Sequence, residues 1–210
     1  MAFPAAYLPI DRRLAMARGE TLPERTVGTA LFADISGFTP LTEALTKNLG
    51  AKRGAEELTK QLNRVYSALI AALDQFQGSV ITFSSDAITC WFDGDAGWRA
   101  ATCALAMQTA MREFATVITP SGAVLALAIK VGLAGGAARR FSVGDASIQT
   151  LDVLAGAPLD RLAAAEFHAN KGEIVASAEI IANLGTNVLP TLLPLLKRRF
   201  CRVRLACGAR

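Results

Sequence analysis

The sequence has few of the residues that metal and redox sites most often use. It contains one histidine, His168, and four cysteines, and no two of these cysteines form a C-x-x-C pair. A structural zinc site needs four such ligands at short spacings, so we expect none in this chain. Cys90 and Cys103 fall in predicted core segments, where we expect small buried thiols rather than reactive ones.

Long apolar runs are also missing. The longest, residues 123–129, has the length of a strand and is far shorter than the roughly 18 residues that cross a bilayer. No basic stretch followed by a long apolar segment occurs near the start, so we expect no secretory signal, no membrane association and a cytoplasmic location. The pattern G-x-x-x-x-G-K-[ST] is absent as well, which argues against a P-loop nucleotide hydrolase.

Positive charge is concentrated at one end of the chain. The formal net charge is +4, but residues 197–210 hold six basic and no acidic side chains. The remaining residues carry sixteen basic and eighteen acidic side chains, a net charge of −2. A nucleic-acid-binding domain needs a basic face with stacking aromatic residues on the fold itself, so we expect no nucleic-acid partner.

The sequence does contain a strand, a carboxylate and a tight turn in immediate succession. Residues 28–39 read GTALFADISGFT and begin with an apolar run that is typical of a buried strand. Asp34 ends the run, Gly37 permits a turn, and Thr39 with Pro40 predicts the start of a helix. A carboxylate beside a helix N-terminus suits a divalent cation and a phosphate. The alternative is that Asp34 is an ordinary solvated turn residue.

A second carboxylate lies at the tip of a predicted hairpin. Residues 78–92 read GSVITFSSDAITCWF, which is two alternating apolar stretches joined by a turn that ends in Asp86. A tip that lies beside the end of the first strand would bring Asp86 next to Asp34. Two carboxylates at one place predict a two-metal site.

Together these blocks resemble the class III nucleotidyl cyclase catalytic domain. The resemblance is carried by residues 32–39 (FADISGFT), 54–58 (GAEEL), 62–63 (LN), 83–87 (FSSDA) and 130–133 (KVGL). It covers residues 26–185 and is strongest toward the first, C1-type half of the soluble, bicarbonate-responsive adenylyl cyclases. It implies an α+β fold, with a ferredoxin-like βαββαβ-type core in which helices cover an antiparallel sheet.

The resemblance also implies roles for particular residues. Asp34 and Asp86 are the expected catalytic residues, and they would hold two Mg²⁺ (or Mn²⁺ or Ca²⁺) with the backbone carbonyl of Ile35 as a further ligand. The implied substrate is ATP, with GTP less favoured. The residues expected to bind its phosphates are Ser36, Gly37, Phe38, Thr39 and Lys130. The alternative for the lysine is a solvated strand residue.

Other positions depart from the family pattern. Thr82 stands where self-sufficient members have a purine-contacting lysine, while Asp160 and Ala164 replace the asparagine and arginine that stabilise the transition state. Ser85 replaces the glycine before the second metal-binding aspartate. We therefore expect the metal-binding half of an enzyme, active at an interface with a complementary C2-type domain. The alternative partner is a second copy of the chain, and we expect such a homodimer to have little activity. The competing interpretation is a catalytically incompetent regulatory or dimerisation module that binds Mg-nucleotide.

A regulator pocket is a further implication of the resemblance. Arg161 and Lys171 are the residues we expect to line it, with bicarbonate as the regulator. The alternative is that both are ordinary solvated side chains, as surface arginines and lysines usually are.

Periodicity and turn residues predict three segments. Residues 1–25 are expected to form an extended arm with one helical turn that packs against the domain, the alternative being a disordered leader. Residues 26–185 form the catalytic domain, and residues 186–210 a basic tail or truncated continuation, in which residues 198–205 alternate like an edge strand. The helices predicted in the domain are 40–49, 54–76, 98–116, 158–169 and 178–184. The strands expected after the first hairpin are 124–131, a hairpin over 141–154 with its turn at 144–145, and 174–176.

Overall fold

Strand β1 (Arg25–Ser36) is the central element of the structure, a computed structural model that describes residues 8–119, 122–145, 148–185 and 196–198. It pairs antiparallel with β3 (Ala87–Asp93) on one side and with β6 (Ala128–Asp145) on the other. The other strands of this sheet are β2 (Ser79–Ser84), β7 (Gln149–Ala155), β8 (Ile174–Ala176) and β9 (Leu196–Arg198). The order is β2-β3-β1-β6-β8-β9, and β7 pairs with β6. Among the described strands, the β6–β8 and β8–β9 pairs are parallel and the other pairs are antiparallel.

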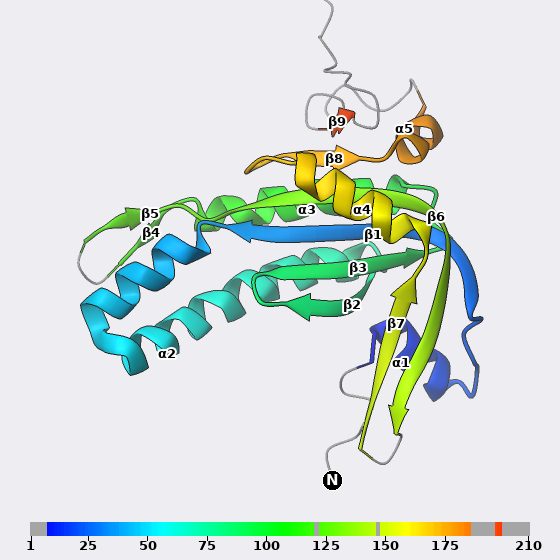
Figure 1. Cartoon of the computed structure of the whole chain (residues 1–210), viewed down its shortest axis with the longest axis horizontal. Helices are drawn as coiled ribbons and strands as arrows, with labels where there is room; N and C mark the ends of the chain where they lie inside the picture. Colours follow the sequence, from blue (N-terminus) through cyan, green and yellow to red (C-terminus); the bar gives the residue numbers. More distant parts are fainter. Residues whose placement is uncertain (1–7, 120–121, 146–147, 186–195, 199–210) are drawn as a thin grey trace, which may run out of the picture.

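Two helices cover one face of this sheet and a third covers part of the other (Figure 1). The first pair is α2 (Phe38–Gln75) and α3 (Trp98–Ala110), and α4 (Ala157–His168) lies over β6 and β1 on the opposite face. The larger core lies between the sheet and α2 and α3, because alternate β1 residues such as Leu31 and Ile35 point that way. Asp34 belongs to the other alternate set, which faces α4.

The smaller elements are α1 (Ile10–Ala17), a 3₁₀ turn (Met111–Phe114), the strand pair β4 (Val117–Ile118) with β5 (Val124–Leu125), and α5 (Ala178–Leu184). This architecture confirms the expected α+β fold with helices covering a mainly antiparallel sheet. The described residues include no helix that is both long enough and apolar enough to span a bilayer. Burial raises the pKa of the Cys103 thiol to about 12 and holds the pKa of the Cys90 thiol well above its usual value, so both are inert core residues.

Element α2 contains the two helices that were expected over 40–49 and 54–76. They are separated at Gly50, whose φ of 78° and ψ of 166° are non-helical, so the break lies where the turn signal at residues 48–51 indicated. The predicted N-cap, Thr39, is wrong, because Gly37 takes that position and the first helix begins at Phe38.

Strand β6 is the largest error of the sequence prediction. We expected a strand over 124–131 and a separate hairpin over 141–154 with its turn at 144–145, but one strand runs from Ala128 to Asp145 through the small residues at 132–138. Its last residues do form the expected hairpin with β7. The small residues are there because α4 packs closely on this strand. A Cβ on Gly132 would lie 3.1 Å from the backbone nitrogen of Glu166 and 3.2 Å from the carbonyl oxygen of Leu162. Glycine inside a strand here marks close backbone approach, not a loop.

The N-terminal segment packs against the hairpin formed by β6 and β7, as Figure 1 shows for α1 beside β7. Its helix has eight residues, more than the single turn we expected. Arg12 Nη2 lies 2.7 Å from Asp152 Oδ1, and Arg140 pairs with both Asp152 and Asp11. Burial alone would lower the pKa of Arg140, but the bonds to Asp11 and Asp152 outweigh it and raise that pKa. We call these four residues the arm cluster.

The described residues include only a short part, residues 196–198, of the predicted C-terminal segment. Strand β9 ends at Arg198, so the alternating stretch expected over 198–205 lies, beyond that residue, outside the described part of the chain.

Candidate active site

The end of β1 and the tip of the β2–β3 hairpin meet at one place. Asp34 is paired in register with Ala87, the residue that follows Asp86, and the Ile35 N–H donates a 2.9 Å hydrogen bond to the Asp86 carbonyl. Both aspartates are partly exposed, whereas the Ile35 side chain is buried in the core. Asp34 and Asp86, which are 52 residues apart in the sequence, therefore lie at neighbouring positions in the fold.

Tyr66 of α2 contacts the hairpin tip and lies close enough to Asp34 and Asp86 for both charges to affect its pKa. Its hydroxyl donates a 2.8 Å hydrogen bond to the Ser85 carbonyl, and its ring packs edge-on against Phe83 with centroids 5.3 Å apart. Burial raises the pKa of Tyr66, and the negative charges of Asp86 and Asp34 raise it further. Ser85 itself has φ 52°, a left-handed conformation that favours glycine. One tyrosine that lies near both charges indicates that they converge at this tip.

Lys130 lies directly opposite Asp34 in the β1–β6 register. Its Nζ is 3.1 Å from Asp34 Oδ2, and it also pairs with Glu166 Oε1 from α4. Glu166 foremost and Asp34 next raise the pKa of Lys130, so the side chain carries a positive charge at neutral pH. The lysine expected to contact phosphate is thus held by carboxylates at the edge of the site, and its phosphate role stays a prediction.

The residues at this place have the chemistry that a hard divalent cation requires. Two carboxylates and a neighbouring backbone carbonyl are oxygen ligands, and Mg²⁺ is usually bound by one or two carboxylates together with substrate phosphates. The Asp34 carboxylate already has a cation, the Lys130 ammonium, as its partner. Among the described residues no three His, Cys, Asp or Glu side chains gather closely enough to hold a metal. A metal here would therefore take further ligands from backbone, water or phosphate.

The turn after Asp34 requires glycine. Gly37 has φ 96°, and a Cβ there would lie 2.4 Å from the Ala126 carbonyl oxygen. This turn presents the backbone N–H groups at the start of α2, which the sequence predicted as a phosphate cradle. The geometry is compatible with that role, because Ser36, Gly37 and Phe38 are all partly exposed and Thr39 is exposed.

Replacing Gly37 by alanine is expected to destabilise the fold by at least about 1–3 kcal/mol, because the left-handed backbone is strained for alanine and the new methyl group meets a carbonyl. The measurement is the free energy of unfolding in urea. Gly19→Ala is the matched control, since Gly19 also has positive φ, 72°, but its Cβ would meet nothing within 4 Å. Equal losses in the two variants would contradict a role for the close contact with Ala126.

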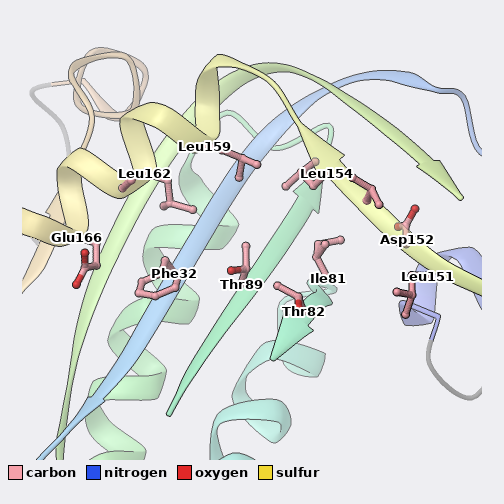
Figure 2. A pocket seen from close by; sticks show the side chains of 12 residues that line it. Phe32, Ile81, Thr82, Thr89, Leu151, Asp152, Leu154, Leu159, Leu162 and Glu166 are labelled. Carbon is pink, nitrogen blue, oxygen red and sulfur yellow. The ribbon is translucent and has the colours of Figure 1, made fainter. Parts of the chain in front are cut away.

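A largely apolar cleft of about 480 Å³ lies on the α4 face of the sheet (Figure 2). Phe32 of β1 and Thr89 of β3 form its floor, β2 and β7 line one side, and Leu159, Leu162 and Glu166 of α4 line the other. The cleft therefore begins at the strand that ends in Asp34. It occupies the part of the sheet that α4 leaves uncovered.

Two of the remaining predicted residues do not meet. Arg161 donates a 2.6 Å hydrogen bond to the Gly135 carbonyl and pairs with Glu179, whereas Lys171 donates a 3.0 Å bond to the Ala126 carbonyl. They share no partner, and neither lines the cleft. The structure therefore does not bring them together into one regulator pocket. Thr82, by contrast, does line the cleft.

Sequence reasoning missed Glu166 and Tyr66. Glu166 follows Leu159 and Leu162 at helical spacing, so an acidic residue on the apolar stripe of α4 was an available signal. Tyr66 had no comparable signal, because an aromatic residue on a long amphipathic helix is typical of core packing.

The strand, turn and hairpin around Asp34 and Asp86, with the half-covered sheet, define a class III nucleotidyl cyclase domain. The family model for the "Adenylate and Guanylate cyclase catalytic domain" matches residues 23–188. The chain belongs to this family.

Known proteins with similar sequences include Adenylate cyclase type 10 from Rattus norvegicus and from Homo sapiens, each 36% identical over 89 residues. The match covers 40% of this chain and 5% of those proteins, so the chain spans a small fraction of the length of these curated relatives.

Similar solved structures include the adenylyl cyclase CyaB from P. aeruginosa, with TM-score 0.62, 21% identity, and coverage of 78% of this chain and 83% of that one. The guanylyl cyclase Cya2 aligns with TM-score 0.60, 22% identity, and coverage of 79% and 81%. At these identities the likeness shows the fold alone. Both adenylyl and guanylyl cyclases share it, so the fold does not choose between ATP and GTP.

Proposed function

We propose that the chain is the metal-binding half of a class III adenylyl cyclase, which converts ATP to cyclic AMP and pyrophosphate at an interface with a complementary C2-type domain. The observation that carries the proposal is the meeting of Asp34 and Asp86 at one strand end beside the Gly37 turn. ATP is favoured over GTP because the similar curated sequences are named as adenylate cyclases. The cytoplasm is the compartment in which we expect this activity.

The chain's own residues have separate tasks in this reaction. Asp34 and Asp86 would hold two divalent ions, with the Ile35 carbonyl as a further ligand. Backbone N–H groups of residues 36–39 would bind the triphosphate, and Lys130 would contact it from the neighbouring strand. The bound ions, when present, supply polarisation of the attacking ribose 3′-oxygen and neutralisation of charge on the phosphates.

The contribution of a partner domain follows from what stands at three positions. Thr82 lines the cleft where self-sufficient members have a purine-contacting lysine, and Asp160 and Ala164 lie on α4 in place of the asparagine and arginine. An aspartate would repel the phosphates rather than stabilise them. The partner would therefore supply the base contact and the transition-state charge, and it would cover the cleft.

A regulatory or dimerisation module is the second candidate. The observation that favours it is the Lys130 ammonium, which already neutralises the Asp34 carboxylate without any divalent ion. Under this alternative the chain would keep the fold and bind Mg-nucleotide without catalysing cyclisation. The intact pair of aspartates at the strand end argues for the enzyme.

The discriminating experiment mixes this chain with a cyclase domain that carries the purine-contacting lysine, the asparagine and the arginine. We expect cyclic AMP from the mixture and at least about 100-fold less from the chain alone, because each site in a homodimer would lack the charge-stabilising arginine. The assay measures the formation of cyclic AMP from ATP and of cyclic GMP from GTP in parallel. Equal rates with and without the partner would contradict the assignment of halves. Nucleotide binding without product from any mixture would favour the regulatory module.

A further inference from the structure

We propose that Glu166 is a positioning residue for the metal site: it holds the Lys130 ammonium so that Asp34 can exchange this ammonium for a divalent cation. The inference rests on the proposed function, because it concerns the same Asp34 carboxylate. It assigns a role to a helix residue that neither belongs to the strand-turn motif nor is expected to touch the metal.

The starting point is that Lys130 and a divalent ion would compete for one carboxylate. Lys130 Nζ lies 3.1 Å from Asp34 Oδ2, which is contact distance for an ion pair. The Lys130 and Asp34 side chains are 24% and 23% exposed, so water screens the pair only in part. An ion that takes over the Asp34 oxygens would deprive the ammonium of this partner, and an unpaired, partly buried ammonium is costly.

Glu166 removes that cost because Lys130 pairs with it at the same time. When Asp34 binds a divalent ion, the Lys130 ammonium keeps Glu166 as its carboxylate partner and stays beside the site. Asp34, Lys130 and Glu166 together carry one net negative charge, and Asp86 at the hairpin tip adds a second. The group can therefore accept a divalent cation without accumulating positive charge.

The backbone places Glu166 firmly enough for this role. At Gly132, two residues after Lys130, a Cβ would lie 3.1 Å from the Glu166 backbone nitrogen, so α4 rests directly on β6 at this point. The Glu166 side chain is 27% exposed and lines the end of the cleft beside Phe32 (Figure 2). Lys130 is thus fixed between a strand on one side and a closely packed helix on the other.

The test measures Mn²⁺ affinity by calorimetry, without nucleotide, for the whole chain. Glu166→Gln keeps the side chain's shape but leaves Asp34 as the remaining carboxylate of the Lys130 pair, so the ammonium should compete better and Mn²⁺ should bind about 5-fold or more weakly. Lys130→Met removes the competitor and should bind Mn²⁺ at least as tightly as the unchanged chain. In the double variant the glutamine should alter Mn²⁺ affinity less than about 2-fold, since there is no ammonium left to hold.

Three outcomes would overturn the inference in distinguishable ways. Equal Mn²⁺ affinity of Glu166→Gln and the unchanged chain would remove the role of Glu166 and leave the metal site standing. The same loss with and without Lys130 would show that Glu166 acts through its charge alone and does not position the lysine. Failure of both the unchanged chain and Lys130→Met to bind Mn²⁺ in an Asp34-dependent way would overturn the proposed metal site, and the role of Glu166 with it. Unfolding in urea checks that each variant is folded.

Discussion

Replacing Asp34 by asparagine is expected to abolish Mn²⁺ binding by this chain and to lower cyclic AMP formation with a complementary domain by about 100-fold or more. Asparagine keeps the shape of the side chain and removes the charge that a hard cation requires. It also removes the ion pair with Lys130, so the lysine would keep only Glu166 as its carboxylate partner. Calorimetry with Mn²⁺ and a non-cyclisable ATP analogue measures binding, and the mixed assay measures product.

The matched control for this substitution is Asp74→Asn, because Asp74 is an exposed aspartate near the opposite end of α2. We expect it to leave both Mn²⁺ affinity and product formation unchanged. Equal Mn²⁺ affinity of Asp34→Asn and the unchanged chain would contradict the proposed metal site. Parallel urea unfolding separates a lost ligand from a lost fold.

Replacing Asp152 by asparagine is expected to cost about 3–5 kcal/mol of folding stability, which is the usual loss when a buried ion pair loses one partner. The Asp152 side chain is fully buried and that of Arg140 is 2% exposed. The carboxylate pairs with two guanidinium groups, those of Arg12 and Arg140. Without its charge the arm cluster would hold two buried arginines against Asp11 alone.

The free energy of unfolding in urea tests this expectation. If its dependence on urea concentration, the m-value, is the same in both proteins, the difference in midpoint reports a change in stability alone. The matched control is Glu20→Gln, which breaks an exposed pair with Arg18 in which both side chains are 58% exposed. Such surface pairs contribute about 0–1 kcal/mol. If Asp152→Asn cost no more than Glu20→Gln, the arm cluster would not stabilise the fold as its burial indicates.

The sequence was sufficient to predict the core of the candidate site because its signals are local. The run that ends in Asp34, the turn at Gly37 and the hairpin tip at Asp86 each lie within a few residues, and the structure brings them together as expected. The resemblance to the cyclases then indicated the fold. The catalytic roles of these residues stay predictions.

Long-range partners could not be predicted in the same way. Lys130 and Glu166 are 36 residues apart, and Arg12 and Asp152 are 140 residues apart, so no periodicity links them. Strand β6 was misjudged for a related reason. Its glycine-containing stretch was not predicted as a strand, because the helices that pack on these glycines, α4 and α5, come later in the chain and their positions on the sheet are a property of the whole fold.

The arm cluster has a practical consequence for anyone who shortens this protein. Asp11 and Arg12 precede the family match, which begins at residue 23. A fragment trimmed to that boundary would therefore open one side of Arg140 and Asp152 to water and lose half of their counter-charges. The excision point for a minimal catalytic fragment belongs upstream of α1.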